Sequence, residues 1–138
     1  MRVLALDYGS ARCGTAVSDP TGVLATPLAP VLAPATRRGR ARLRELIAET
    51  GAERVLIGLP LSLDGEDSAQ TAETRAFAEG LARAVAVPVE LFDERFTTRM
   101  AERTGGRASE DSRAAAHLLE GWLAARRPVV GAPEDADV

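Results

Sequence analysis

The order of its apolar segments predicts that this chain is an α/β domain, with a mixed five-stranded sheet and helices on its faces. Three short apolar runs come first and are typical of strands, and strands then alternate with amphipathic helices. The expected strands cover residues 2–7, 13–18, 23–31, 54–59 and 87–92. A hairpin that leads into strand–helix alternation indicates a mixed sheet.

The first expected strand, residues 2–7, is an apolar run that ends in Asp7. Turn-forming residues at 8–12 connect it to the second strand, so the two form a hairpin. The third strand contains Pro27 and Pro30. Because proline cannot donate a hydrogen bond to a neighbouring strand, we expect this strand to end at an edge of the sheet.

The two helices in the middle of the chain are predicted from apolar residues at helical spacing. An arginine- and alanine-rich segment, 35–42, precedes a helix that continues to about Thr50 and is stopped by Gly51. A second helix is expected over residues 68–85. Its predicted inward side chains are Ala72, Phe77, Ala78 and Leu81.

The C-terminal third predicts a loop, a helix and a tail. Residues 99–110 are polar and contain glycine, so we expect a mobile loop. A last helix begins at Asp111 or Ser112. The acidic segment 128–138 is expected to be disordered. The folded domain is therefore predicted to span residues 1–127.

Composition limits the class of protein and its location. The chain has 138 residues, enough for one domain with a core, and no apolar run long enough to span a bilayer. Its single cysteine, Cys13, excludes a disulfide within the chain, which favours the cytoplasm. The net charge of −3 argues against a strongly basic nucleic-acid-binding surface. Acids of a metal site and an acidic tail can nevertheless mask a basic patch in that total.

Three acids occupy positions where a carboxylate needs a partner. Asp7 ends the first strand, Glu94 follows the strand at 87–92, and Asp111 opens the last helix above its apolar stripe. Each has an ordinary alternative: Asp7 can cap a turn, Glu94 can pair with a nearby arginine, and Asp111 can cap its helix. Ser109 or Ser112 could serve as that cap equally well.

Taken together, two acids at strand ends and one on a covering helix predict an oxygen-rich site for Mg²⁺ or Mn²⁺. Two such ions can activate water and stabilise the leaving oxygen in phosphodiester cleavage. The only histidine, His117, lies within the last helix, which argues against Ser/His/Asp catalysis. The sequence contains neither a zinc-type Cys/His cluster nor a Walker A motif.

Four blocks of sequence resemble the YqgF/RuvX family, whose members are described as Holliday junction resolvases and as nucleases that mature the 5′ end of pre-16S rRNA. The resemblance extends from residue 3 to about residue 125. The blocks are Leu6-Asp7-Tyr8-Gly9 with Arg12, Gly14 and Ala16-Val17-Ser18-Asp19; Ile57-Gly58-Leu59-Pro60-Leu61 with Asp64-Gly65; Asp93-Glu94-Arg95-Phe96-Thr97-Thr98; and Asp111-Ser112 with Ala114, Ala115, Leu118 and Leu119.

The resemblance implies an RNase H-like fold and a metal-dependent nuclease acting on pre-rRNA or branched DNA. It places the family's acidic triad on Asp7, Glu94 and Asp111, as catalytic residues and as ligands of Mg²⁺ or Mn²⁺. The predicted substrate-binding residues are the arginines around these acids: Arg12, Arg95, Arg99 and Arg107. The chain departs from the family at Ala11, where a basic residue is frequent, and in the loop before the last helix, which is often lysine-rich.

Other functions compete with a nuclease. A phosphate-binding module of the actin, Hsp70 and sugar-kinase type starts with a similar hairpin but generally needs two such domains. A non-catalytic RNase H-like module that binds nucleic acid or protein is the chief alternative. The arginines of residues 37–44 are either a phosphate-contacting patch or, as the helical wheel favours, a solvated surface. Resolution of a junction would call for a homodimer, whereas trimming one RNA end would not.

Overall fold

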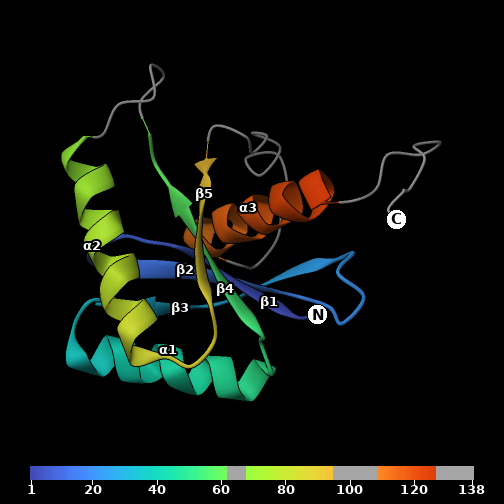
Figure 1. Ribbon diagram of the computed structural model, residues 1–138, viewed down its shortest axis with the longest axis horizontal. Helices are drawn as coiled ribbons and strands as arrows, with labels where there is room; N and C mark the ends of the chain where they lie inside the picture. Colours follow the sequence, from blue (N-terminus) through green and yellow to red (C-terminus); the bar gives the residue numbers. More distant parts are fainter. Residues whose placement is uncertain (62–67, 95–108, 127–138) are drawn as a thin grey trace.

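The computed structural model describes residues 1–61, 68–94 and 109–126, and a five-stranded sheet forms its centre (Figure 1). The strands are β1 (Val3–Asp7), β2 (Arg12–Ser18), β3 (Ala25–Leu32), β4 (Arg54–Leu59) and β5 (Val89–Asp93). Their order across the sheet is β3-β2-β1-β4-β5. Strand β2 is antiparallel to β1 and β3, whereas β4 is parallel to β1 and β5. The predicted mixed sheet is confirmed.

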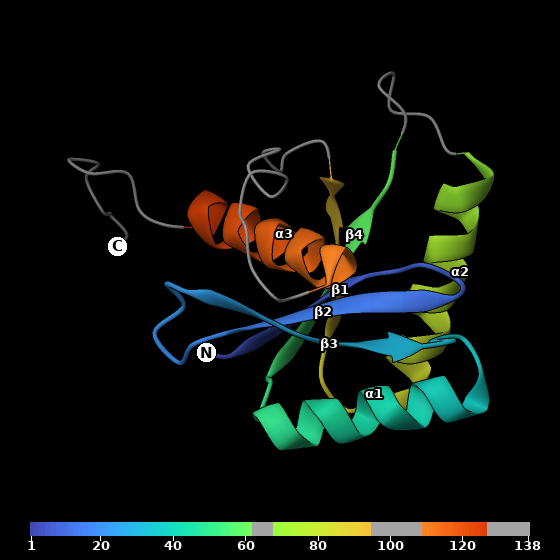
Figure 2. The ribbon, with the colours of Figure 1, turned by 180° about the vertical axis from the view of Figure 1, so that it is seen from behind.

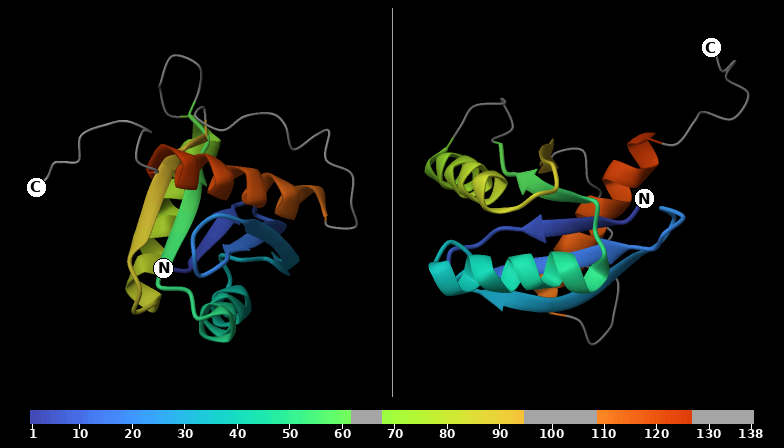
Figure 3. Two further views of the ribbon diagram at one scale, coloured as in Figure 1. Left: turned by 90° about the vertical axis from the view of Figure 1, so that its right-hand side faces the viewer. Right: turned by 60° about the horizontal axis from the view of Figure 1, so that its bottom comes forward.

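Three helices cover the two faces of this sheet. They are α1 (Arg37–Thr50), α2 (Ala69–Ala84) and α3 (Glu110–Arg126). Helices α1 and α2 lie on one face and α3 lies alone on the other, as Figure 2 and Figure 3 show from two sides. The chain therefore forms three layers, in which the sheet has a buried core on each side.

The central strand β1 contributes to both cores because successive side chains of a strand point to opposite faces. Leu4 and Leu6 belong to the core beneath α1 and α2, and Val3 and Ala5 belong to the core beneath α3. All four are fully buried. The next residue in the alternation, Asp7, consequently belongs to the α3 face.

The structure agrees with the expected position of the third strand and corrects the start of the first helix. Strand β3, which contains Pro27 and Pro30, lies at an edge of the sheet as predicted. Helix α1 already begins at Arg37, within the segment that was expected to precede it. The Thr36 side chain caps this helix by accepting a hydrogen bond from the Gly39 amide, and arginine and alanine are good helix formers.

Helix α2 buries three of its four predicted inward residues and two threonines that were not predicted. Phe77, Ala78 and Leu81 face the core, but Ala72 is exposed, and Thr71 and Thr74 are buried instead. Both threonine hydroxyls are satisfied, since Thr71 donates to the Pro60 carbonyl and Thr74 to the Gln70 carbonyl. A hydrogen-bonded threonine can occupy an apolar interface that an apolar-residue pattern does not reveal.

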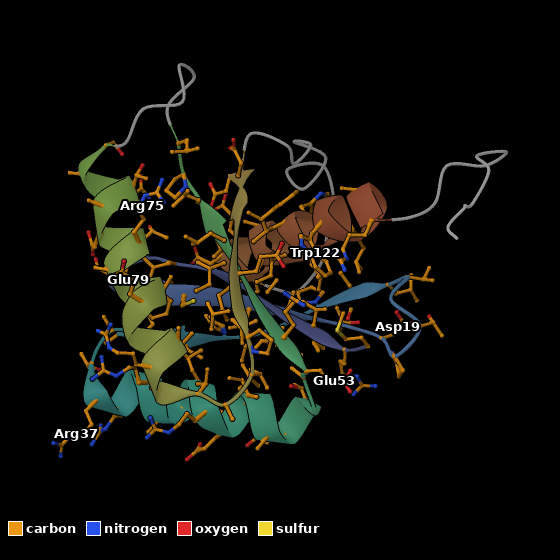
Figure 4. All side chains as sticks on the ribbon, viewed as in Figure 1. Asp19, Arg37, Glu53, Arg75, Glu79 and Trp122 are labelled. Carbon is orange, nitrogen blue, oxygen red and sulfur yellow. The ribbon has the colours of Figure 1, made fainter. Side chains whose placement is uncertain are left out.

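Strand β5 is tied to α3 and to β4 by one carboxylate. Glu90 accepts a hydrogen bond from the indole N–H of Trp122 at 3.0 Å and an ion-paired hydrogen bond from Arg54 at 2.9 Å. Figure 4 shows Trp122 on α3, close to the sheet. The Arg126 guanidinium lies 4.4 Å from the centre of the Trp122 ring. These contacts fix β5 relative to α3.

Two sequence predictions lie wholly or largely outside the described residues: the tail 128–138, and the loop 99–110 except for its last two residues. Of those two, Ser109 precedes α3 and Glu110 is its first residue.

No helix in the described ranges is long and apolar enough to cross a membrane.

The Glu90 contacts can be tested by comparing two substitutions. Glu90→Leu should lower the free energy of unfolding by about 1–3 kcal/mol, because it leaves the Arg54 and Trp122 donors without their acceptor. Glu90→Gln keeps an acceptor oxygen and should lower it less. Urea denaturation of both variants measures the difference, and equal losses would show that the hydrogen bonds contribute nothing specific.

Candidate active site

Asp7 lies at the carboxyl end of the central strand, on the face covered by α3. It is opposite Gly14 of β2 in the antiparallel pairing. On its other side, the β1–β4 register ends one residue earlier, at Leu6 and Ile57. Asp7 is partly buried, whereas the residues before it in β1 are fully buried. A carboxylate at such a position is stable when it has a partner or a cation.

Glu94 reaches Asp7 from the edge strand β5, across the intervening strand β4. It directly follows β5 and has the same alternation as Glu90, whose carboxylate contacts Trp122 of α3. The carboxyl groups of Asp7 and Glu94 share a hydrogen bond. Asp93 belongs to the opposite alternation, so only one of this pair of acids enters the site.

Asp111 approaches from α3, whose first turn rests on β2. The helix is capped by Ser109, whose hydroxyl accepts a hydrogen bond from the Ser112 amide at 3.1 Å. Asp111 is therefore not needed as the cap, and that alternative is not supported. The fully buried Ser112 hydroxyl accepts a hydrogen bond from the Thr15 amide of β2 at 3.2 Å. This contact fixes the start of α3 on the sheet. The sequence pattern did not predict it.

The structure brings two of the three predicted carboxyl groups into contact, and their sharing of one metal ion with the third stays a prediction. Asp7 and Glu94 are in contact, but the Asp111 carboxylate pairs with Arg12 at 3.8 Å. Within the described residues, no three Asp, Glu, His or Cys side chains are arranged to hold a metal ion together. The position of the Asp111 carboxylate follows from its attraction to the positively charged Arg12 guanidinium.

The close carboxylates change each other's affinity for protons. Burial, and after it the negative charges of Glu94 and Asp111, together raise the pKa of Asp7 to about 7. Burial also raises the pKa of Glu94, and the hydrogen bond with Asp7 opposes that shift. The same hydrogen bond contributes to the raised pKa of Asp7.

The other predicted site residues have different outcomes. Arg12 is exposed at the start of β2 and lies beside Asp111, as described above. Arg95, Arg99 and Arg107 lie outside the described residues, so their contacts with substrate stay predictions. The same holds for the alternative in which Glu94 pairs with Arg95 or Arg99.

Two further residues near the N-terminus, Asp19 and Cys13, have defined structural surroundings. Asp19 lies at the turn between β2 and β3, far from Arg75 and Glu79 of α2 in Figure 4. Its carboxylate accepts hydrogen bonds from the amides of Val23 and Leu24 at 2.8 and 2.9 Å, so it caps this turn. Cys13 is buried and free, and burial raises the pKa of its thiol well above the usual range.

The arginines of α1 lie away from the carboxylates. Helix α1 packs on the face of the sheet opposite α3. Arg42 pairs with Glu45 and Glu49 of its own helix, and Arg40 donates to the Ala35 carbonyl. Arg37, Arg38 and Arg44 are exposed, which agrees with a solvated helix surface.

Comparisons with known proteins agree with this fold and sequence pattern. The family model RuvX, described as "Holliday junction resolvase", matches residues 1–125. A protein of Anaeromyxobacter sp. named "Putative pre-16S rRNA nuclease" is 42% identical over 135 residues, covering 91% of this chain and 98% of the relative. A protein of the same name from Chloroflexus aurantiacus is 40% identical over 134 residues, covering 91% and 88%.

A structural comparison finds the fold of RuvC. The Thermus thermophilus RuvC structure superimposes with a TM-score of 0.60 at 18% identity, covering 91% of this chain and 96% of RuvC. A second RuvC structure from T. thermophilus, in complex with a Holliday junction substrate, gives a TM-score of 0.58. At this low identity the likeness concerns the fold, which is RNase H-like. With the family model matching nearly all of the described residues, the chain belongs to the RuvX family.

Proposed function

We propose that this chain is a metal-dependent endonuclease that hydrolyses phosphodiester bonds, with Asp7, Glu94 and Asp111 as its catalytic carboxylates. The observation that carries the proposal is the contact between Asp7 and Glu94, two partly buried acids brought together from non-adjacent strands. Two carboxylates held together in this way raise the free energy of the folded chain unless a proton or a cation lies between them. Carboxyl groups with strongly shifted pKa values are concentrated at active sites, which supports a catalytic role for this pair.

The residues at this position fit a hard divalent cation. The donor atoms are carboxylate oxygens, which Mg²⁺ and Mn²⁺ prefer. Burial first, and the neighbouring negative charges second, raise the pKa of Asp7 to about 7, and a cation would offset both effects. Asp7 and Glu94 would hold the ion, and Asp111 would join them on leaving Arg12. That separation is easy because an ion pair at 3.8 Å between partly exposed side chains contributes little. When bound, divalent ions supply an activated water and stabilise the leaving oxygen.

The surrounding residues have separate tasks in this scheme. Asp7 and Glu94 are oriented by the sheet, so these two acids need little reorganisation before the reaction, whereas the Asp111 side chain would turn from Arg12. Arg12 is exposed beside them and can contact a phosphate of the substrate through its guanidinium. We assign the same role to Arg95, Arg99 and Arg107.

The substrate that we propose first is pre-16S rRNA, because that is the substrate named for relatives of about 40% identity over most of the chain. Branched DNA is the second candidate, because the matched family model is described as a Holliday junction resolvase. We place the activity in the cytoplasm, where a single free cysteine is stable in its reduced form. Action on a junction would involve a homodimer.

The stability of the metal-free protein should depend on pH through Asp7. The folded protein keeps a proton on Asp7 up to about pH 7, whereas the unfolded chain loses it near the ordinary pKa of 3.8. Stability is therefore lost as pH rises from about 4 to about 7 and stays low above that range. Asp7→Asn removes this effect, so it should raise Tm by several degrees at about pH 8 and much less at about pH 4.

Scanning calorimetry with and without Mn²⁺ measures both parts of this expectation. Saturating Mn²⁺ should raise the Tm of the parent and should raise that of Asp7→Asn much less, because the variant binds the ion more weakly. If Asp7→Asn shifts Tm equally at both pH values, that result contradicts the raised pKa of Asp7 in the folded protein.

Cleavage assays test the function itself. With Mg²⁺ or Mn²⁺, the parent should cut a pre-16S rRNA fragment or a four-way DNA junction. Asp7→Asn, Glu94→Gln and Asp111→Asn should each lower the rate by about 100-fold or more, because each removes a negative charge from the site. Glu79→Gln, on the exposed surface of α2, is the matched control and should cut at the parental rate.

The two substrates distinguish the candidate functions. Cleavage of RNA alone would support rRNA maturation, and cleavage of the junction alone would support resolution. If the parent cuts neither with either ion, or if Asp7→Asn cuts as fast as the parent, the chain is a non-catalytic binding module.

A further inference from the structure

We propose that Gly58 is a positioning residue, whose missing side chain lets Glu94 reach across β4 to Asp7. The proposal rests on the proposed function, because it assigns to Gly58 the task of assembling the carboxylate site. It adds a residue of β4, a strand that supplies none of the three acids, to the requirements of that site.

The sheet order creates the problem that Gly58 solves. Asp7 ends β1 and Glu94 follows β5, but β4 lies between these two strands. Strands that are next-but-one neighbours are separated by two spacings, or about 10 Å. The Glu94 side chain must therefore lie over the face of β4 to share a hydrogen bond with Asp7.

The residue of β4 at this crossing is Gly58. It follows Ile57, which pairs with Leu6, so Gly58 is level with Asp7 in the parallel register. It is also the direct partner of Phe92 in β5. Leu56, two residues earlier, is buried beneath α3, and the alternation therefore gives Gly58 the α3 face that Asp7 and Glu94 share.

A side chain at Gly58 would occupy the space that Glu94 uses. A Cβ atom there would lie 2.6 Å from Glu94 Oε2, 2.9 Å from its Cγ and 3.1 Å from its Cδ. These three are the nearest heavy atoms, and all belong to the Glu94 side chain. The added methyl group would thus displace the carboxylate while the backbone around it could stay in place.

Gly14, on the other side of Asp7, provides a contrast. A Cβ atom there would lie 2.0 Å from the Asp111 carbonyl oxygen and 2.8 Å from the Ser112 amide nitrogen. Those atoms are backbone at the start of α3 and cannot move without moving the helix. Asp7 therefore lies between two glycines: Gly58 leaves space for the Glu94 side chain, and Gly14 leaves space for the backbone at the start of α3.

The variants Gly58→Ala, Gly14→Ala and Gly80→Ala separate these roles. Gly80 lies on α2, and a Cβ atom there would meet nothing within 4 Å, so this variant is the matched control. Without metal, Gly58→Ala should keep a Tm close to that of the parent, whereas Gly14→Ala should lower it by several degrees. A large loss of stability in Gly58→Ala would contradict the proposal, since the three atoms nearest to the added Cβ all belong to a movable side chain.

Crystal structures grown without metal test the position of Glu94 directly. The Glu94 carboxylate should contact Asp7 in the parent and in Gly80→Ala, and should be displaced from Asp7 in Gly58→Ala. An unchanged Asp7–Glu94 contact in Gly58→Ala would overturn the proposal. This result is independent of whether the protein is a nuclease.

Calorimetric titration with Mn²⁺ supplies the second readout. Gly58→Ala should weaken Mn²⁺ binding by about 10-fold to 100-fold, the range typical of residues that orient a metal ligand, and Gly80→Ala should not change it. In a Glu94→Gln background, Gly58→Ala should have little further effect, because both changes act through the same carboxylate. Undiminished binding in Gly58→Ala would overturn the proposal. Failure of the parent to bind Mn²⁺ would instead contradict the proposed function, and the crystal structures would still decide the role of Gly58.

Discussion

The alternation of side chains along the central strand is the constraint on which the rest of the structure depends. Four residues of β1 are divided between two cores, and the same alternation directs Asp7 to the face beneath α3. The other two acids can meet Asp7 only from that face. This explains why Glu94, and not Asp93, enters the site.

Much of this arrangement is predictable from local sequence patterns. The strand at 54–59 was predicted with the bounds that β4 has, because an apolar run between turn residues is a strong signal. The face of Glu94 follows from the two-residue period of β5. The buried threonines of α2 and the early start of α1 were missed, because hydrogen-bonded hydroxyl groups and helix propensity do not follow apolar periodicity.

The relative positions of the acids were harder to predict because they depend on contacts between distant segments. The sequence pattern alone does not state that β4 separates Asp7 from Glu94, or that the Ser112 hydroxyl joins α3 to β2. It also gives no reason for Asp111 to pair with Arg12, because that contact depends on how the folded chain places the two charges. Gly14 and Gly58 of the sequence blocks leave room for α3 and for the Glu94 side chain, but these contacts can be recognised only in the folded chain.

Anomalous diffraction from crystals soaked in Mn²⁺ tests the central claim most directly, because it locates the ion without an assay or a choice of substrate. The account predicts an anomalous peak bound by the carboxylates of Asp7 and Glu94, with the Asp111 side chain turned from Arg12 toward the ion. The peak should be absent from Asp7→Asn crystals treated in the same way. A fully soaked parental crystal without this peak, or with Mn²⁺ bound only elsewhere, would contradict the account.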